Sequence, residues 1–182
     1  MKQVDIKNIQ EAGESQRLIP GGYICTITAV EDVPDKEYLR ISFDIADGDF
    51  KGYATDSAKR LGSWPYDCQY IRSYKPAALP FFKRMCTAIS KSNGNFIFDG
   101  GTVNSDEKTL IGKAVGLVLG EEEYIGNDGN LKTRVRVVGE HPVDNIKQGK
   151  FKVPPLKKLP DDDIPLNTPT ISETSEPGGL PF

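Results

Sequence analysis

Residues 38–45 show the strictest periodicity in the chain and predict a β-strand with two different faces. Four apolar residues alternate with four others: Leu39, Ile41, Phe43 and Ile45 against Tyr38, Arg40, Ser42 and Asp44. Successive side chains of a strand point to opposite sides of a sheet. We therefore expect one face of this strand to be buried and the other to face solvent.

Four further segments are predicted to form strands. Residues 23–31 are rich in β-branched side chains and are followed by a turn at 32–36 that contains Pro34. Residues 50–55 are expected to form the third strand. Residues 113–125 and 131–138 flank Gly126-Asn127-Asp128-Gly129-Asn130, a strong turn signal that predicts a hairpin.

One principal helix is predicted at residues 77–92. Phe81, Met85 and Ile89 recur at helical spacing, and Pro80 falls in the first turn, where its missing N–H has no intrahelical partner. Residues 56–75 show no clear period and are expected to be a long loop, and 143–148 a short helical turn.

The predicted order is three strands, a helix and two strands. This is the element order of the OB-fold, a small five-stranded Greek-key barrel whose faces and loops bind single-stranded nucleic acids or sugars. We expect a mainly β protein with a lead-in at 1–18, one OB-fold domain at 19–159 and a tail at 160–182.

The tail differs from the rest of the chain in composition. It holds five acids and no Lys or Arg, so the 23 bases of the whole chain face 26 − 5 = 21 acids in residues 1–159. Such a segment cannot bury enough apolar surface to offset its ordering entropy, and we expect it to stay mobile and to recruit a partner protein. The candidate partner-binding residues are Asp161, Asp162, Asp163, Leu180, Pro181 and Phe182.

Cysteine usage and hydropathy indicate where the protein works. Cys25, Cys68 and Cys86 are widely spaced and form no CxxC pair, which is typical of thiols in a reducing cytoplasm. The first seventeen residues are too polar for a signal peptide, and the longest apolar stretch is too short to span a membrane. A cytoplasmic protein without a membrane partner is expected.

The segment 59–75 combines aromatic rings with cations, the two kinds of group that single-stranded nucleic acid requires. Aromatic faces stack on unpaired bases and cations neutralise phosphates. The candidates are Lys59, Arg60, Trp64, Tyr66, Tyr70, Arg72, Tyr74 and Lys75. The tyrosines recur every four residues, so they would form one stripe if the segment were helical. The alternative is that this stripe packs on the barrel.

The last predicted strand places Lys132, Arg134 and Arg136 on one face, about 6.8 Å apart, a spacing comparable to that of phosphates along an extended strand. The alternative is that Glu121 and Glu123 of the partner strand pair with these cations. Tyr38 and Arg40 share the solvated face of their strand and are further candidates, as is Tyr53.

Catalytic and cofactor motifs are weak. The chain has no G-x-G-x-x-G motif or phosphate loop, and its only histidine, His141, with scattered cysteines makes a poor zinc or nucleophile set. Asp44, Asp47, Asp49 and Asp56 could serve a metal-dependent nuclease, but Asp-Gly-Asp between strands is more often a turn. Neither an enzyme nor a cofactor is expected.

Four stretches of the chain carry a family resemblance: 19–53, 71–75, 118–124 and 151–154. Through them the chain resembles phage-encoded single-stranded DNA-binding proteins of the OB-fold kind, a family from phages of Gram-positive bacteria. The tail separately resembles that of bacterial single-stranded DNA-binding proteins, in which an acidic stretch and a terminal Pro-Phe dock on partners. Here the Asp run lies well upstream of Phe182.

The resemblance implies a protein that binds single-stranded DNA with little sequence preference during phage replication or recombination, in the cytoplasm of the infected bacterium. The tail would recruit replication or recombination proteins, and a homo-oligomer is possible. The alternatives are an OB-like protein-interaction module, such as a phage adaptor or host inhibitor, and a metal-dependent nuclease.

Overall fold

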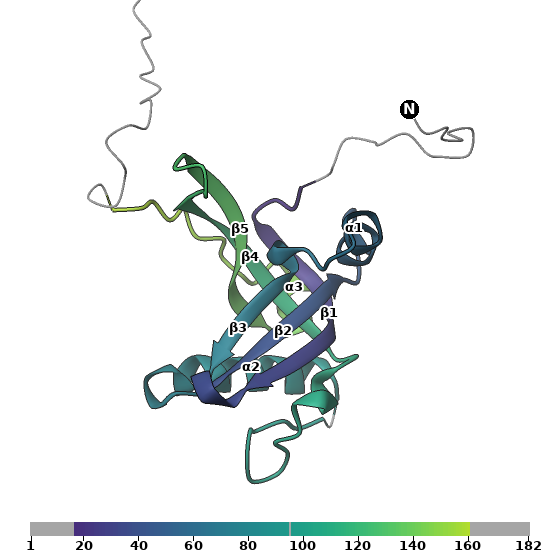
Figure 1. Cartoon of the computed structure of the whole chain (residues 1–182). Coiled ribbons are helices and arrows are strands. Elements are labelled where there is room, and N and C mark those ends of the chain that lie inside the picture. Colours follow the sequence, from purple (N-terminus) through teal and green to yellow (C-terminus); the bar gives the residue numbers. More distant parts are fainter. Residues whose placement is uncertain (1–16, 95, 161–182) are drawn as a thin grey trace, which may run out of the picture.

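The computed structural model describes residues 17–94 and 96–160, and these form a curled five-stranded antiparallel sheet with one principal helix (Figure 1). The strands are β1 (Gly21–Val33), β2 (Tyr38–Ile45), β3 (Gln69–Ser73), β4 (Ala114–Ile125) and β5 (Leu131–His141). The helices are α1 (Tyr53–Leu61), α2 (Leu79–Ser92) and α3 (Val143–Lys147). The sheet order is β3-β2-β1-β4-β5, and the expected mainly β, OB-like fold is confirmed.

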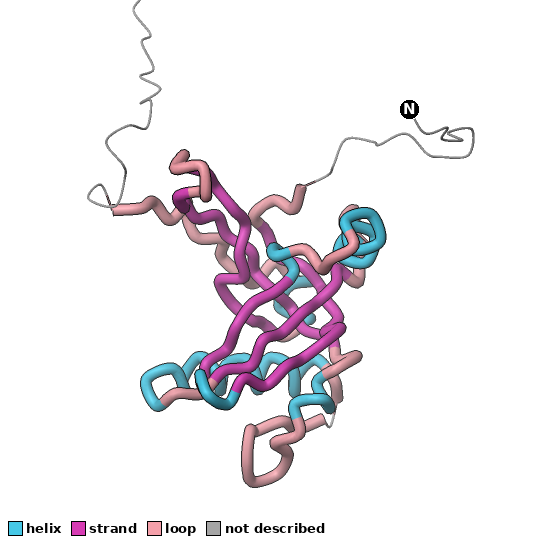
Figure 2. The backbone as a smooth tube through the Cα atoms, in the orientation of Figure 1, coloured by secondary structure: helices cyan, strands magenta, loops and turns pink. Residues whose placement is uncertain are grey.

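The long strand β1 serves both halves of the sheet. Residues 21–26 pair with β4, and residues 25–33 pair with β2, so two residues belong to both ladders. The register with β2 shifts between Ile27 and Ala29, where a bulge bends the strand. This bend lets a single sheet curl toward closure, as the tube in Figure 2 shows.

The core lies inside the curled sheet and against α2. On β2 the predicted apolar face is buried, although Asp44 on the other face is buried as well. Helix α2 covers the lower end of the sheet in Figure 1 and buries Met85 and Ile89 there. Asn93 ties the end of this helix to β4, because its amide donates to the Ile89 and Ala114 carbonyls and accepts from the Ala114 N–H.

Two sequence predictions between β2 and α2 are wrong. The expected third strand at 50–55 is a turn and the first part of α1, because the Asp44 carboxylate accepts hydrogen bonds from the N–H groups of Ala54 (2.8 Å) and Thr55 (3.1 Å) at the start of that helix. The expected loop at 56–75 holds most of α1 and the true third strand, β3. Tyr66, Tyr70 and Tyr74 therefore do not form a helical stripe.

A buried ion cluster joins the two edge strands. Glu140 of β5 is almost fully buried and pairs with Arg72 of β3 and, at 3.4 Å, with Arg84 of α2. The Arg72 guanidinium also lies over the Tyr70 ring, 5.1 Å from its centroid. We call Glu140, Arg72 and Arg84 the seam cluster.

After α3, the chain runs back along the sheet toward the hairpin. The Phe151 ring packs on Gly22, where an added Cβ would lie 2.4 Å from a ring carbon. Lys157 exchanges backbone hydrogen bonds with β4, both 2.9 Å long, through the Glu123 N–H and the Glu121 carbonyl. The last described residues therefore lie beside the β4–β5 hairpin (Figure 1). Within the described ranges, no helix combines the length and apolar character of a membrane span.

Candidate nucleic-acid interface

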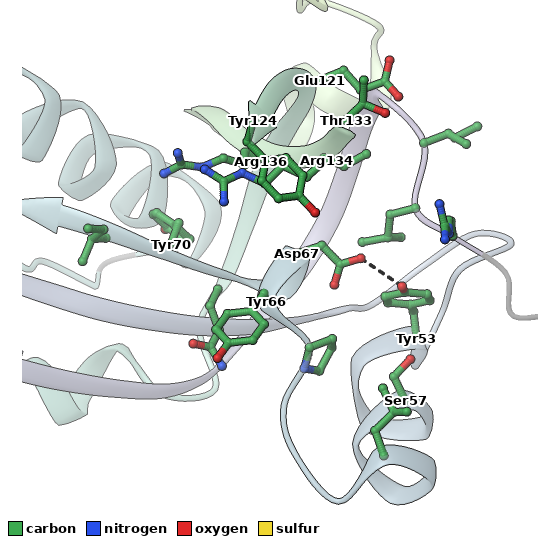
Figure 3. A pocket seen from close by; sticks show the side chains of 18 of the residues that line it. Tyr53, Ser57, Tyr66, Asp67, Tyr70, Glu121, Tyr124, Thr133, Arg134 and Arg136 are labelled. Carbon is green, nitrogen blue, oxygen red and sulfur yellow. Dashed lines mark hydrogen bonds between the residues drawn. The ribbon is translucent and has the colours of Figure 1, made fainter. Parts of the chain in front are cut away.

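A groove of about 1110 Å³ lies between α1 and the β4–β5 hairpin (Figure 3). Residues of α1 and of the connection to β3 form one wall, including Tyr53, Ser57 and Tyr66. The hairpin forms the other wall with Tyr124, Arg134 and their neighbours, and β2 and β3 contribute between them. Because five tyrosines and five arginines line it, we call it the tyrosine–arginine groove.

The tyrosines lining the groove are Tyr38, Tyr53, Tyr66, Tyr70 and Tyr124. Tyr66, in a 3-10 turn just before β3, is 93 % exposed and presents most of its ring to solvent. Tyr124 is partly buried on β4, and the Arg134 guanidinium lies 4.7 Å from its ring centroid. A ring held by a cation on one face can still offer a stacking surface elsewhere.

Tyr53 is fixed in orientation by a hydrogen bond across the wall. Its hydroxyl donates to the Asp67 carboxylate over 2.9 Å, as the dashed line in Figure 3 shows. Burial and the neighbouring Asp67 charge raise the pKa of the Tyr53 hydroxyl, so it remains a proton donor at neutral pH. The bond directs the Asp67 carboxylate toward Tyr53.

Tyr70 differs from the other four because only 6 % of it is exposed. Its ring meets Phe43 edge-on, and its hydroxyl is buried without a hydrogen-bond partner among the described residues. Burial raises the pKa of this hydroxyl strongly. Tyr70 thus supports the groove from below and does not offer a free ring face, which agrees with the packing alternative for this residue.

The arginines make the groove positive. Arg17, Arg40, Arg60, Arg134 and Arg136 line it together with two acids, Asp67 and Glu121, which gives 5 − 2 = +3. Within residues 17–94 and 96–160, two acids outside the lining reduce this surplus: Glu31 pairs with Arg40 at 2.7 Å, and Glu122 pairs with the two hairpin arginines. Counting all four acids leaves +1.

One carboxylate oxygen of Glu122 holds both hairpin arginines. Arg134 Nε donates to it over 2.8 Å and Arg136 Nη1 over 2.9 Å. Partial burial would raise the pKa of Glu122, but the hydrogen bonds from Arg136 and Arg134 outweigh it and hold the pKa below its ordinary value. Glu122 is therefore charged at neutral pH. A single negative charge orients two cations and leaves one positive charge in excess.

The register explains why Glu122 is the partner. It lies opposite Arg134, whereas the proposed partners Glu121 and Glu123 lie opposite Val135 and Thr133. Directly opposed residues of an antiparallel pair share a face of the sheet. The expected cross-strand pairing is thus present in this hairpin, but through a different glutamate. Lys132 is paired separately, with Asp128 at 2.7 Å, and that bond lowers the pKa of Asp128 to about 2.

The groove collects eight of the fourteen residues predicted to bind nucleic acid. They come from β2, α1, the segment before β3, β3 itself and β5: Tyr38, Arg40, Tyr53, Arg60, Tyr66, Tyr70, Arg134 and Arg136. The fold therefore brings together candidates that are up to 98 positions apart in the sequence.

The other six predicted residues do not line the groove. They are Lys59, Trp64, Arg72, Tyr74, Lys75 and Lys132. The Trp64 indole packs on the core and donates to the Cys68 carbonyl over 3.3 Å, and Tyr74 packs edge-on against Phe82. Lys59 pairs with Asp56 at 3.3 Å on the exposed side of α1.

The structure adds groove residues that the sequence reasoning did not select, above all Tyr124. It lies opposite Lys132 in the hairpin and two positions along β4 from Glu122, on the same face. The strong turn signal at 126–130 together with the two-residue period could have identified it. Ile71 of β3 and Arg17, before β1, also line the groove.

Three of the four carboxylates considered for a nuclease have local structural partners. Asp44 binds the first turn of α1, Asp47 accepts from the Gly48 N–H of its own turn, and Asp56 pairs with Lys59. In residues 17–94 and 96–160, no three His, Cys, Asp or Glu side chains lie close enough together to hold a metal ion.

The predicted partner-binding residues 161–163 and 180–182 lie outside the described residues. A search of known protein families found no family model that matches this chain, and no curated protein matches it significantly. The tyrosine–arginine groove is accordingly interpreted from its own geometry and charge.

Proposed function

We propose that the chain binds single-stranded DNA, with little sequence preference, along the tyrosine–arginine groove. The observation that carries this proposal is the convergence of five tyrosines and five arginines on one groove of an OB-like sheet. The tyrosines and the arginines each come from several different elements. The packing of one helix or strand therefore does not explain why they line the same groove.

The rings provide sequence-tolerant contacts. Every base has a π-face, and stacking on an aromatic side chain contributes about 1–3 kcal/mol per base. Tyr66 is the most exposed of the five rings, and Tyr124 faces it from the hairpin side of the groove (Figure 3). A base stacked on Tyr124 would lie beside Arg134, whose guanidinium is 4.7 Å from the ring centroid.

The arginines provide the phosphate contacts. The shared carboxylate of Glu122 pre-orients Arg134 and Arg136, so little side-chain entropy is lost when a phosphate joins them. Neutralising about four to five phosphates gives a slope of log affinity against log salt of about −3 to −3.5 for a single strand.

The biological setting follows from the sequence resemblance. We propose that the protein acts without catalysis in the replication or recombination of a phage genome, in the cytoplasm of its host. In this proposal residues 161–182 recruit partner proteins, with Asp161, Asp162, Asp163, Leu180, Pro181 and Phe182 as the contact residues.

The test is a titration of fluorescein-labelled oligo-dT with the full chain, followed by anisotropy, at several salt concentrations and with or without magnesium. We expect saturable binding that weakens with the slope given above and leaves the oligonucleotide intact. No binding at low salt would favour the protein-interaction alternative, and magnesium-dependent shortening of the oligonucleotide would favour a nuclease.

A further inference from the structure

A second groove, of about 900 Å³, lies on α2 and has a different character. Its apolar lining consists of Pro76, Leu79, Pro80, Phe82, Cys86 and Phe98. Phe82 and Cys86 form a buried floor, whereas Leu79 is 48 % exposed at the side. We call this the α2 groove. Its volume is in the range of sites that hold small molecules or a few side chains.

The polar rim of the α2 groove is mainly cationic. Lys83 and Lys91 lie on α2 at its edge, and neither forms an ion pair with an acid of residues 17–94 or 96–160. The one acid in the lining, Asp99, already accepts hydrogen bonds from the N–H groups of the loop that follows it, at residues 101, 103 and 104. A ligand with apolar side chains and nearby negative charge complements this surface.

The chain itself contains such a ligand. Leu180-Pro181-Phe182 follows Glu173 and Glu176, and residues 160–182 contain no base. We propose that the Leu180–Phe182 triplet of the same chain occupies the α2 groove, with these two glutamates near Lys83 and Lys91. The groove would then hold the triplet until a partner protein competes for it.

The length of the chain permits this contact. Pro160 follows Leu159, whose N–H donates to Glu123 of the hairpin, so the described chain ends near the hairpin tip. Strand β5 leads from that tip to α2 in 11 residues, about 36 Å, and the Val143 N–H then donates to Ser92 at the end of α2. The remaining 182 − 160 = 22 residues can span up to about 73–79 Å.

Attachment to the same chain also strengthens a weak contact. A connection of this length gives an effective concentration of about 1 mM. With an intrinsic Kd of about 0.1 mM, the attached triplet occupies about nine-tenths of the grooves, and a competing peptide binds about tenfold more weakly than to an empty groove.

The experiment uses a fluorescein-labelled peptide of residues 170–182 as probe and full-length chains as receptors. Binding to the wild-type chain is compared with binding to the L180A/F182A variant. We expect the peptide to bind the variant about tenfold more tightly. Equal affinity for both chains, or no binding to either, would overturn the proposal.

Two further variants locate the contact. Thr87 is exposed and lines the α2 groove, so Thr87→Glu in the L180A/F182A background adds a negative charge there with little risk to folding. It should abolish peptide binding, whereas Gln148→Glu, an exposed position outside both grooves, should not. Retained binding by the Thr87→Glu chain would place the peptide elsewhere and overturn the assignment.

A measurement of molecular size distinguishes binding of the triplet within its own chain from binding to a second copy of the chain. Sedimentation of the wild-type chain should show no association that depends on Leu180 and Phe182. A dimer that dissociates in the L180A/F182A variant would show that the triplet binds another molecule and contradict the intramolecular contact.

Discussion

The tyrosine–arginine groove and the α2 groove use different chemistry. The elements that form them, α1 with the hairpin and α2, lie toward opposite ends of the same sheet in Figure 1. In the first, Glu31 holds Arg40 and Glu122 holds both Arg134 and Arg136, and four of the five tyrosines stand at the walls. In the second, buried apolar side chains form the floor, and only the rim is charged. One surface suits a flexible polyanion, and the other suits a short apolar segment.

This difference arises because different elements meet at each groove. The tyrosine–arginine groove forms where the curled sheet stays open between β3 and the hairpin, so exposed strand faces supply long polar side chains. The α2 groove forms where a helix that closes the barrel meets the loop after it, and that junction exposes the edge of the core. The seam cluster lies between them and links β3, β5 and α2.

The largest expected effect concerns the seam cluster. Glu140→Gln leaves Arg72 and Arg84 without their buried carboxylate, and we expect the free energy of unfolding to fall by about 3–5 kcal/mol. Urea denaturation followed by circular dichroism measures this. Glu107→Gln is the control, because Glu107 forms no ion pair within the described part of the chain. A loss below about 1 kcal/mol for Glu140→Gln would show that Glu140 does not hold β3, β5 and α2 together.

The next effect tests the positive charge of the tyrosine–arginine groove. The double change Arg134→Ala with Arg136→Ala removes two charge-assisted phosphate contacts, each contributing about 1.5 kcal/mol, so oligo-dT affinity should fall about 150-fold. The salt slope should also shrink by about 1.4. Lys132→Ala, which removes a cation paired with Asp128 outside the groove, is the matched control and should change affinity less than twofold. Equal losses for both variants would mean that the hairpin acts only through its overall charge.

Stacking can be tested at the most exposed ring. Tyr66→Ala should weaken oligo-dT binding by about 1–3 kcal/mol, and Tyr66→Phe should keep most of the affinity, because the ring face and not the hydroxyl carries the contact. Trp64→Ala is the comparison: the indole packs on the core, so its loss should lower thermal stability while the folded protein keeps its affinity. If Trp64→Ala lost affinity and Tyr66→Ala lost only stability, Trp64 would be the stacking residue and Tyr66 the packing residue.

The smallest effect has the opposite sign. Glu122→Gln removes the acid that partly neutralises Arg134 and Arg136, and we expect oligo-dT affinity to rise about three- to tenfold at low salt. Anisotropy titration measures this, with Asp35→Asn, an exposed change far along the chain, as control. A fall in affinity would show that orientation by Glu122 matters more than the charge that it cancels.

The sequence predicted the elements whose pattern is local. The alternation at 38–45, the turn at 126–130 and the helical spacing of Met85 and Ile89 each depend on neighbours a few positions apart, and the resulting strands and helix are present in the structure. The segment between β2 and α2 was mispredicted because its structure depends on a contact across ten positions, from Asp44 to Ala54.

The residues of the site show the same division between local patterns, which the sequence reveals, and contacts between distant positions, which it does not. The two-residue period of the last strand predicted that the arginines of the hairpin share a face, and the mixture of rings and cations at 59–75 selected several tyrosines. Burial could not be deduced in the same way, because it depends on contacts between distant elements. Tyr74 meets Phe82 of α2, Tyr70 meets Phe43 of β2 beneath the groove, and Trp64 packs on the core. Tyr124 required the hairpin register, which places it beside the arginine pair.

The most direct test of nucleic-acid binding by the tyrosine–arginine groove is a titration of the isotope-labelled full chain with oligo-dT, followed residue by residue in 1H–15N NMR spectra. We predict that signals of Tyr66, Tyr124, Arg134 and Arg136 shift together with a common affinity, while those of Thr87 and Lys91 in the α2 groove stay in place. Shifts centred on α2, or no shifts at a concentration of oligonucleotide that saturates the anisotropy signal, would contradict it.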